Sequence, residues 1–140
     1  MTPITLTVSG VFDPAKIFLG KGGGDDTSPT VVVPSNRLLT IESVYAQVSM
    51  PTGQKAGLAI ATRLGDSSPD FFYALVLEHQ VTYTERDRSV LDVYKGNNSM
   101  RVYFKTDSDP AYIELLGTRG PATTGRGNVS VTIVGYLNDA

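Results

Sequence analysis

Residues 4–12 read Ile-Thr-Leu-Thr-Val-Ser-Gly-Val-Phe, and their pattern is the strongest indication of the fold class in this sequence. Apolar and polar side chains alternate along it, with the apolar ones at Ile4, Leu6 and Val8. Such alternation is typical of a β-strand that turns one face to the core and the other to solvent. The same period of two returns near the other end of the chain, in residues 129–137. The pattern predicts an all-β fold.

About eight strands are expected along the chain. We place them at residues 4–12, 30–33, 38–50, 55–64, 71–83, 100–106, 111–116 and 129–137. The sequence contains 14 Gly and 8 Pro, which is enough to break it into short strands with frequent turns. No alternation of strands with long amphipathic helices is visible, so we predict an antiparallel β-sandwich of the jelly-roll kind. Residues 85–93 fit either a short helix or a strand.

The 140 residues suit one domain, residues 1–140. Two turns are expected to close hairpins, at residues 51–53 and 95–98. A change of apolar phase within residues 38–50 predicts a bulge near Glu42.

Two loops have unusual composition. Residues 20–29 are rich in glycine and are expected to be flexible. Residues 117–127 contain two arginines, four glycines and no acid. We interpret Arg119 and Arg126 as candidates for contact with carboxylates of a partner, since guanidinium groups bind carboxylates through two hydrogen bonds. The alternative is a solvated connection.

The core is predicted from the apolar face of each strand. We expect six side chains to be buried: Leu75, Leu77, Val102, Phe104, Val131 and Ile133.

Charge and composition exclude several classes of partner. Twelve basic and fourteen acidic residues give a net charge of −2 and an isoelectric point near 5.2, so nucleic acid is not an expected partner. No apolar run reaches the length of about 20 residues needed to span a bilayer. No signal peptide is visible and cysteine is absent, which fits synthesis in a reducing cytoplasm.

The residue types needed for common catalytic sites are scarce. His79 is the only histidine, and we interpret it as a structural or interface residue rather than a general base. Without cysteine, neither a thiol nucleophile nor a zinc site of the usual kind is available. We therefore expect no catalytic residue, no metal and no cofactor. Two acid-based alternatives stay open: a carboxylate pair among Glu42, Glu78, Glu85 and Glu114, and calcium bound by Asp25, Asp26, Asp66, Asp70, Asp107 and Asp109.

Three stretches carry a resemblance to known proteins. They are Arg-Leu-Leu-Thr-Ile-Glu at 37–42 before a Pro-Thr-Gly-Gln turn, Met-Arg-Val-Tyr-Phe at 100–104, and Val-Thr-Ile-Val-Gly-Tyr-Leu at 131–137. The chain thereby resembles small bacterial β-sandwich proteins, and jelly-roll decoration (cement) proteins of tailed-phage capsids. The resemblance spans about residues 37–137 and transfers no functional residue.

Two functions follow as hypotheses. The first is a non-enzymatic structural module: a homo-oligomer, possibly a trimer, attached to a larger assembly. The resemblance makes this a virion surface protein for capsid decoration or the tail, present in the cytoplasm before assembly. The second is a carbohydrate-binding module that uses some of the seven tyrosines for stacking.

Overall fold

The computed structural model describes residues 2–12, 17–21, 30–64, 71–108, 111–120 and 125–140. These residues form ten strands and no helix. The strands are β1 (Thr2–Phe12), β2 (Ile17–Lys21), β3 (Thr30–Val33), β4 (Arg37–Pro51), β5 (Lys55–Leu64), β6 (Phe71–Leu75), β7 (Glu78–Thr84), β8 (Val90–Lys105), β9 (Ala111–Gly120) and β10 (Gly127–Asp139). The all-β prediction is confirmed, with ten described strands where about eight were expected.

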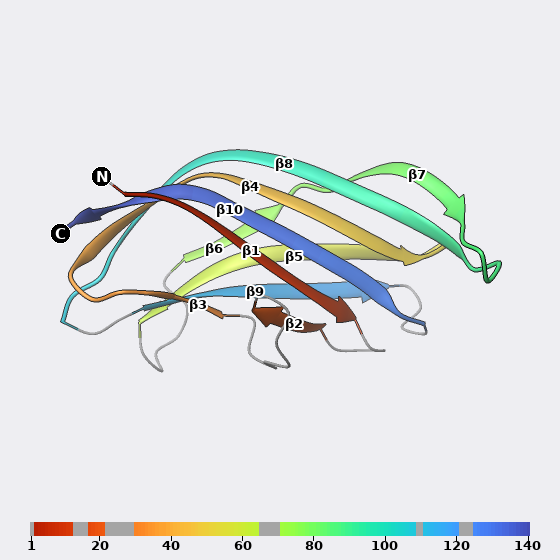
Figure 1. The fold of residues 1–140 in the computed structure, drawn as a ribbon, viewed down its shortest axis with the longest axis horizontal. Helices are drawn as coiled ribbons and strands as arrows, with labels where there is room; N and C mark the ends of the chain where they lie inside the picture. The colour runs from red at the N-terminus through yellow and green to blue at the C-terminus, as the bar shows by residue number, and fades with distance from the viewer. Residues whose placement is uncertain (1, 13–16, 22–29, 65–70, 109–110, 121–124) are drawn as a thin grey trace.

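The strands form two antiparallel sheets. Six strands lie in the order β2-β1-β10-β4-β8-β7, and four lie in the order β3-β9-β5-β6. Figure 1 shows the sheets as two layers, with the two chain ends together at one end of the molecule. This position of the ends follows from the pairing of β1 with β10, in which Thr2 lies opposite Leu137.

One hydrophobic core joins both sheets. It includes Val44, Val48 and Val131 from the larger sheet and Ile60 and Ile113 from the smaller one, each at most 1% exposed. Of the six predicted core residues, Leu75, Phe104, Val131 and Ile133 are buried, whereas Leu77 and Val102 are partly buried against the cluster. The period of two therefore identified the core face of β10 correctly.

The bulge predicted near Glu42 is confirmed. The register between β4 and β8 shifts between Ile41 and Ser43. Because one extra residue reverses the alternation, Ile41 before the bulge and Val44 after it both face the core, and both are fully buried. Both halves of β4 pair with β10 and β8 in one sheet, and the bulge keeps their apolar side chains on its core face.

The hairpin expected around residues 51–53 is a turn between sheets instead. Gln54 donates a backbone hydrogen bond to Pro51, and Gly53 has a φ of 83°. However, β4 pairs on its two sides with β8 and β10, so β5 has no free edge of β4 to join. β5 pairs with β6 and β9 in the other sheet.

The single strand expected over residues 71–83 is wrong. The chain leaves the smaller sheet at the end of β6 and enters the larger sheet at the start of β7, so Val76 and Leu77 connect the two. Val76 lies close to Gly96, where an added Cβ would meet the Val76 carbonyl oxygen at 1.8 Å. The Asn98 side chain accepts a hydrogen bond from the Val76 amide (2.8 Å) and donates one to the Val76 carbonyl (3.3 Å).

Three further expectations concern turns and loops. Residues 95–98 lie within β8 and form no hairpin turn, and residues 85–89 form the turn between β7 and β8, so no helix covers 85–93. The long loop expected at 117–127 is shorter, because β9 continues to Gly120 and β10 begins at Gly127. Of the expected glycine-rich loop 20–29, the first two residues belong to β2, and 22–29 lie outside the described residues.

Candidate functional site

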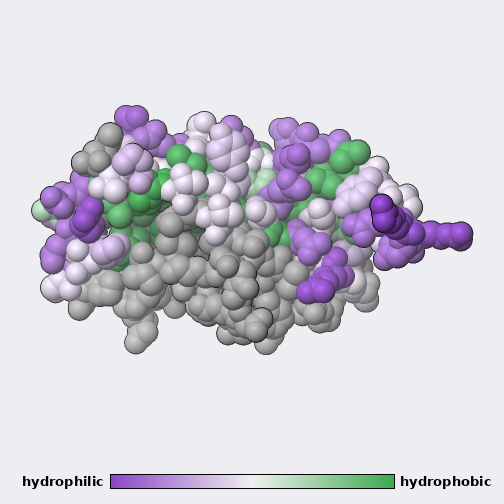
Figure 2. Space-filling model, in the orientation of Figure 1, coloured by the Kyte–Doolittle hydropathy of each residue, from purple (hydrophilic) through white to green (hydrophobic). Residues whose placement is uncertain are grey.

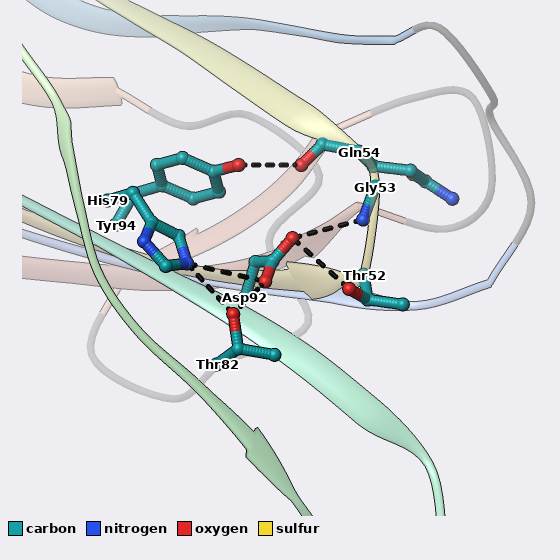
Figure 3. Close-up of polar contacts among 7 residues, drawn as sticks. All are labelled: Thr52, Gly53, Gln54, His79, Thr82, Asp92 and Tyr94. Carbon is teal, nitrogen blue, oxygen red and sulfur yellow. Dashed lines mark hydrogen bonds and ion pairs between the residues drawn. The ribbon is translucent and has the colours of Figure 1, made fainter.

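Asp92 is the centre of the polar network drawn in Figure 3. It lies on β8 and is 8% exposed. Its carboxylate accepts hydrogen bonds from the Thr82 hydroxyl on β7 (2.5 Å), the Gly53 amide (3.0 Å) and the Thr52 hydroxyl (3.4 Å). His79 Nε2 lies 3.3 Å from the same carboxylate. The network therefore ties the edge strand β7 to the turn that leads from β4 to β5.

The network shifts the pKa values of two groups, Asp92 and Tyr94. The hydrogen bond from the Thr82 hydroxyl, followed by that from the Gly53 amide, lowers the pKa of Asp92, since both stabilise the carboxylate. Burial, and then the negative charge of Asp92, raise the pKa of Tyr94. The Tyr94 hydroxyl donates to the Gln54 carbonyl oxygen (3.1 Å), and its ring meets His79 edge to face at 5.5 Å. Tyr94 thus stays a neutral donor within a network that keeps Asp92 ionised.

His79, Asp92 and Thr82 do not have the geometry of a nucleophile with its base. In a catalytic triad, the carboxylate binds one ring nitrogen of histidine and the nucleophile binds the other. Here Thr82 Oγ1 (3.0 Å) and Asp92 both lie at Nε2, and the Thr82 hydroxyl donates its hydrogen bond to the Asp92 carboxylate. These contacts link the side chains of β7 and β8.

His79 lies on the exposed edge strand β7. Its side chain is 48% exposed. The register between β7 and β8 also shifts between His79 and Val81, so the two do not follow a simple alternation.

Arg119 and Arg126, the two predicted contact residues, occupy different settings. Arg119 lies in β9 and is partly buried; its guanidinium donates to Gln54 Oε1 (2.6 and 3.1 Å) and to the Gly125 carbonyl (2.9 Å). It therefore braces the turn after β4 against the segment before β10. Arg126 is exposed just ahead of β10. Contact of either arginine with a partner stays a prediction.

Strand β7 is exposed along its whole length. Among the described strands it pairs only with β8, at one edge of the larger sheet, and each of its seven residues is exposed. Val81 (49%) and Tyr83 (39%) lie on it, and Val76 (63%) and Val90 (37%) lie beside it. Figure 2 shows hydrophobic surface near this end of the molecule, next to a strongly hydrophilic projection. An edge strand with apolar side chains offers both backbone and side-chain groups to another strand.

A hollow of about 580 Å³ lies on the outer face of the larger sheet. Among its lining residues are Tyr45 and Gln47 from β4, Lys95 and Asn97 from β8, and Ser130 from β10. Cross-strand register places these side chains on the face opposite to the buried Ala46, Val48 and Val131. The volume is within the range usual for small-molecule sites.

Among the described residues, no group of three or more histidines or acids is placed to hold a metal ion, and no helix has the length and apolarity to cross a bilayer. Of the aspartates considered for calcium, Asp107 is described, whereas Asp25, Asp26, Asp66, Asp70 and Asp109 lie outside the described residues. The side chain of Glu114 lies outside them as well.

Several residues of these sites were missed from the sequence. Asp92 and Asn98 are polar positions whose partners lie far away in the sequence, in the turn after β4 and in the connection between β6 and β7, so nothing local marks them. The polar residues of the hollow are ordinary solvent-facing strand residues until neighbouring strands bring them together. One signal was available: Gly96 interrupts an otherwise strand-like stretch, which indicates a bulge or a close backbone approach.

Comparison with protein-family models, with curated proteins and with solved structures finds no match to this chain. Any function proposed for it therefore depends on its own residues and their geometry.

Proposed function

We propose that this chain is a jelly-roll domain that works as a non-enzymatic structural module and assembles through the edge strand β7. The order of the strands supports the jelly roll. With β2 and β7 set aside, the other eight strands, numbered 1 to 8 along the chain, lie in the orders 1-8-3-6 and 2-7-4-5. This is the order of two Greek keys folded into facing four-stranded sheets, an architecture found in viral capsid and lectin domains.

The observation that carries the assembly proposal is the exposure of β7. All seven of its residues are exposed, yet the strand includes Val81 and Tyr83. Natural proteins commonly protect an edge with charges, prolines or a covering segment, because an open edge recruits other strands. Strand β7 itself has one acidic residue, Glu78, no lysine or arginine, and no proline.

The partner that β7 fits best is β7 of a second copy. In an antiparallel pair centred on Thr82, Val81 lies opposite the partner's Tyr83, which is a favourable aromatic and β-branched combination. Glu78 then lies opposite the partner's Arg86, in the turn that follows β7. Both apolar and ionic pairs occur twice, as required for an isologous contact about a twofold axis.

This pairing is tested by charge reversal. Glu78→Arg or Arg86→Glu alone sets like charges opposite each other, so each should weaken self-association measured by sedimentation across a range of concentrations. The double variant E78R/R86E restores opposite charges and should recover association. Val81→Lys should also weaken it, whereas Tyr103→Lys, at an exposed tyrosine elsewhere on β8, should not.

A strictly monomeric mass for the unaltered chain at every concentration would refute the assembly proposal. Weakening by both single variants without recovery in the double variant would refute the register.

The larger setting proposed for the module is a virion surface, as a capsid decoration or tail-associated protein. The jelly-roll strand order and an exposed assembly edge support this setting. A trimer would need an additional, heterologous contact, since an edge paired with itself closes as a dimer.

A further inference from the structure

We infer that the hollow on the outer face of the larger sheet is a binding site for short neutral oligosaccharides. The inference does not need assembly through β7: Tyr45 and Gln47 on β4 and Asn97 on β8 are central to it, and Glu78 and Gln80 of β7 line only the border of the hollow.

The hollow is built from two rows of side chains. Ser130, Gln47, Lys95 and Glu78 lie opposite one another across β10, β4, β8 and β7, and Thr132, Tyr45 and Asn97 form the next row. Facing side chains in antiparallel strands are about 5 Å apart at Cβ. The rows therefore form a dense field of hydroxyl and amide groups, which is suited to a ligand with many hydroxyls.

Three amides in this field have no hydrogen-bond partner among the described residues. Within the part of the chain that the structure describes, the exposed side chains of Gln47, Gln80 and Asn97 make no hydrogen bond, in contrast to Asn98, which binds Val76. An amide offers an acceptor and two donors in one plane. It can therefore accept a hydrogen bond from one sugar hydroxyl and donate one to the next hydroxyl.

Tyr45 supplies the apolar surface that a sugar ring needs. Its side chain is 49% exposed although it lies in the middle of the sheet, between Thr132 and Asn97. A sugar ring has one face of C–H groups, which packs against an aromatic ring while its hydroxyls reach the surrounding amides. Aromatic surface flanked by planar polar groups is the combination that favours sugar over a purely apolar ligand.

The charge of the hollow selects a neutral sugar. Its described lining contains one lysine and one glutamate, Lys95 and Glu78, which lie opposite each other in the register of β7 and β8. Their charges offset each other, so a carboxylated or phosphorylated ligand gains no net attraction.

The test uses the whole chain with four neutral disaccharides, cellobiose, maltose, lactose and diacetylchitobiose, and with sialyllactose as an acidic comparison. Binding is followed by NMR chemical-shift changes and calorimetry. We expect at least one neutral sugar to bind, Tyr45→Ala to weaken it about tenfold, and Gln47→Ala to weaken it severalfold. Tyr103→Ala, at a tyrosine 59% exposed on the same sheet but outside the hollow, should bind as the unaltered chain does.

Three results would overturn the inference: no binding of any neutral sugar, equal losses for Y45A and Y103A, or tighter binding of sialyllactose than of lactose. The variant Val81→Lys separates this site from the assembly proposal, since it should lose self-association and keep sugar binding.

Discussion

Replacing Gly96 by alanine probes the place where the chain passes from one sheet to the other. The new Cβ would lie 1.8 Å from the Val76 carbonyl oxygen and 3.0 Å from its carbon, so backbone rather than a flexible side chain must move. Overpacking of this kind costs about 1–3 kcal/mol. Displacing Val76 also threatens its two hydrogen bonds with Asn98, each worth about 1 kcal/mol. We therefore expect a loss of about 2–5 kcal/mol in the free energy of unfolding.

Urea denaturation, followed by far-ultraviolet circular dichroism, measures this loss. Gly120→Ala is the matched control, because Gly120 also lies in a strand and its added Cβ would meet nothing within 4 Å. The control should change stability by less than about 1 kcal/mol, in either direction. If G96A were as stable as the unaltered chain, or if G120A lost as much, the close approach of Val76 to β8 would not be what requires glycine at position 96.

Two further predictions concern the polar network. Asp92 has a lowered pKa in the folded state, so its ionised form stabilises the fold above the unfolded pKa of about 3.9, and this contribution is lost as the pH falls from there through the folded pKa. Asp92→Asn should therefore lower stability at pH 7, by about 1–3 kcal/mol, and flatten the fall in stability below about pH 4; an unchanged acid limb in pH-dependent melting would contradict this. Arg119→Ala should lower the melting temperature, because Gln54 and the Gly125 carbonyl lose their donor, whereas Arg126→Ala should not. If R126A instead weakens self-association in a salt-sensitive way with folding intact, the predicted contact role of Arg126 is supported; association unchanged at every salt concentration would argue against it.

The fold class could be predicted from the sequence because alternation is a local property. In β10, Val129, Val131 and Ile133 are buried as their spacing indicates, since a strand directs every second side chain to the same face. The bulge near Glu42 could be predicted for the same reason, as a change of phase within one strand.

The candidate sites could not be predicted in the same way. Tyr45 and Asn97 are far apart in the sequence and become neighbours only through the register of β4 with β8. Arg119 was expected in a loop, and its position in β9 follows from pairing with β5, where Ala56 lies opposite it. Side-chain type alone carried no information about these partners.

Local alternation was enough to identify this chain as an all-β protein. The division of residues 71–84 between two sheets, which leaves β7 at an open edge, arises only in the folded chain. The apolar stretch of residues 71–77 does not end where β6 ends, so composition does not mark the division. Beyond the end of β6, Val76 is exposed and Leu77 is partly buried against the core. The break between β6 and β7 depends on two residues about twenty positions further on. Gly96 allows the Val76 backbone to approach β8 closely, and the Asn98 side chain forms hydrogen bonds with that backbone. Local periodicity cannot predict such a contact, since it forms only when folding brings the two segments together.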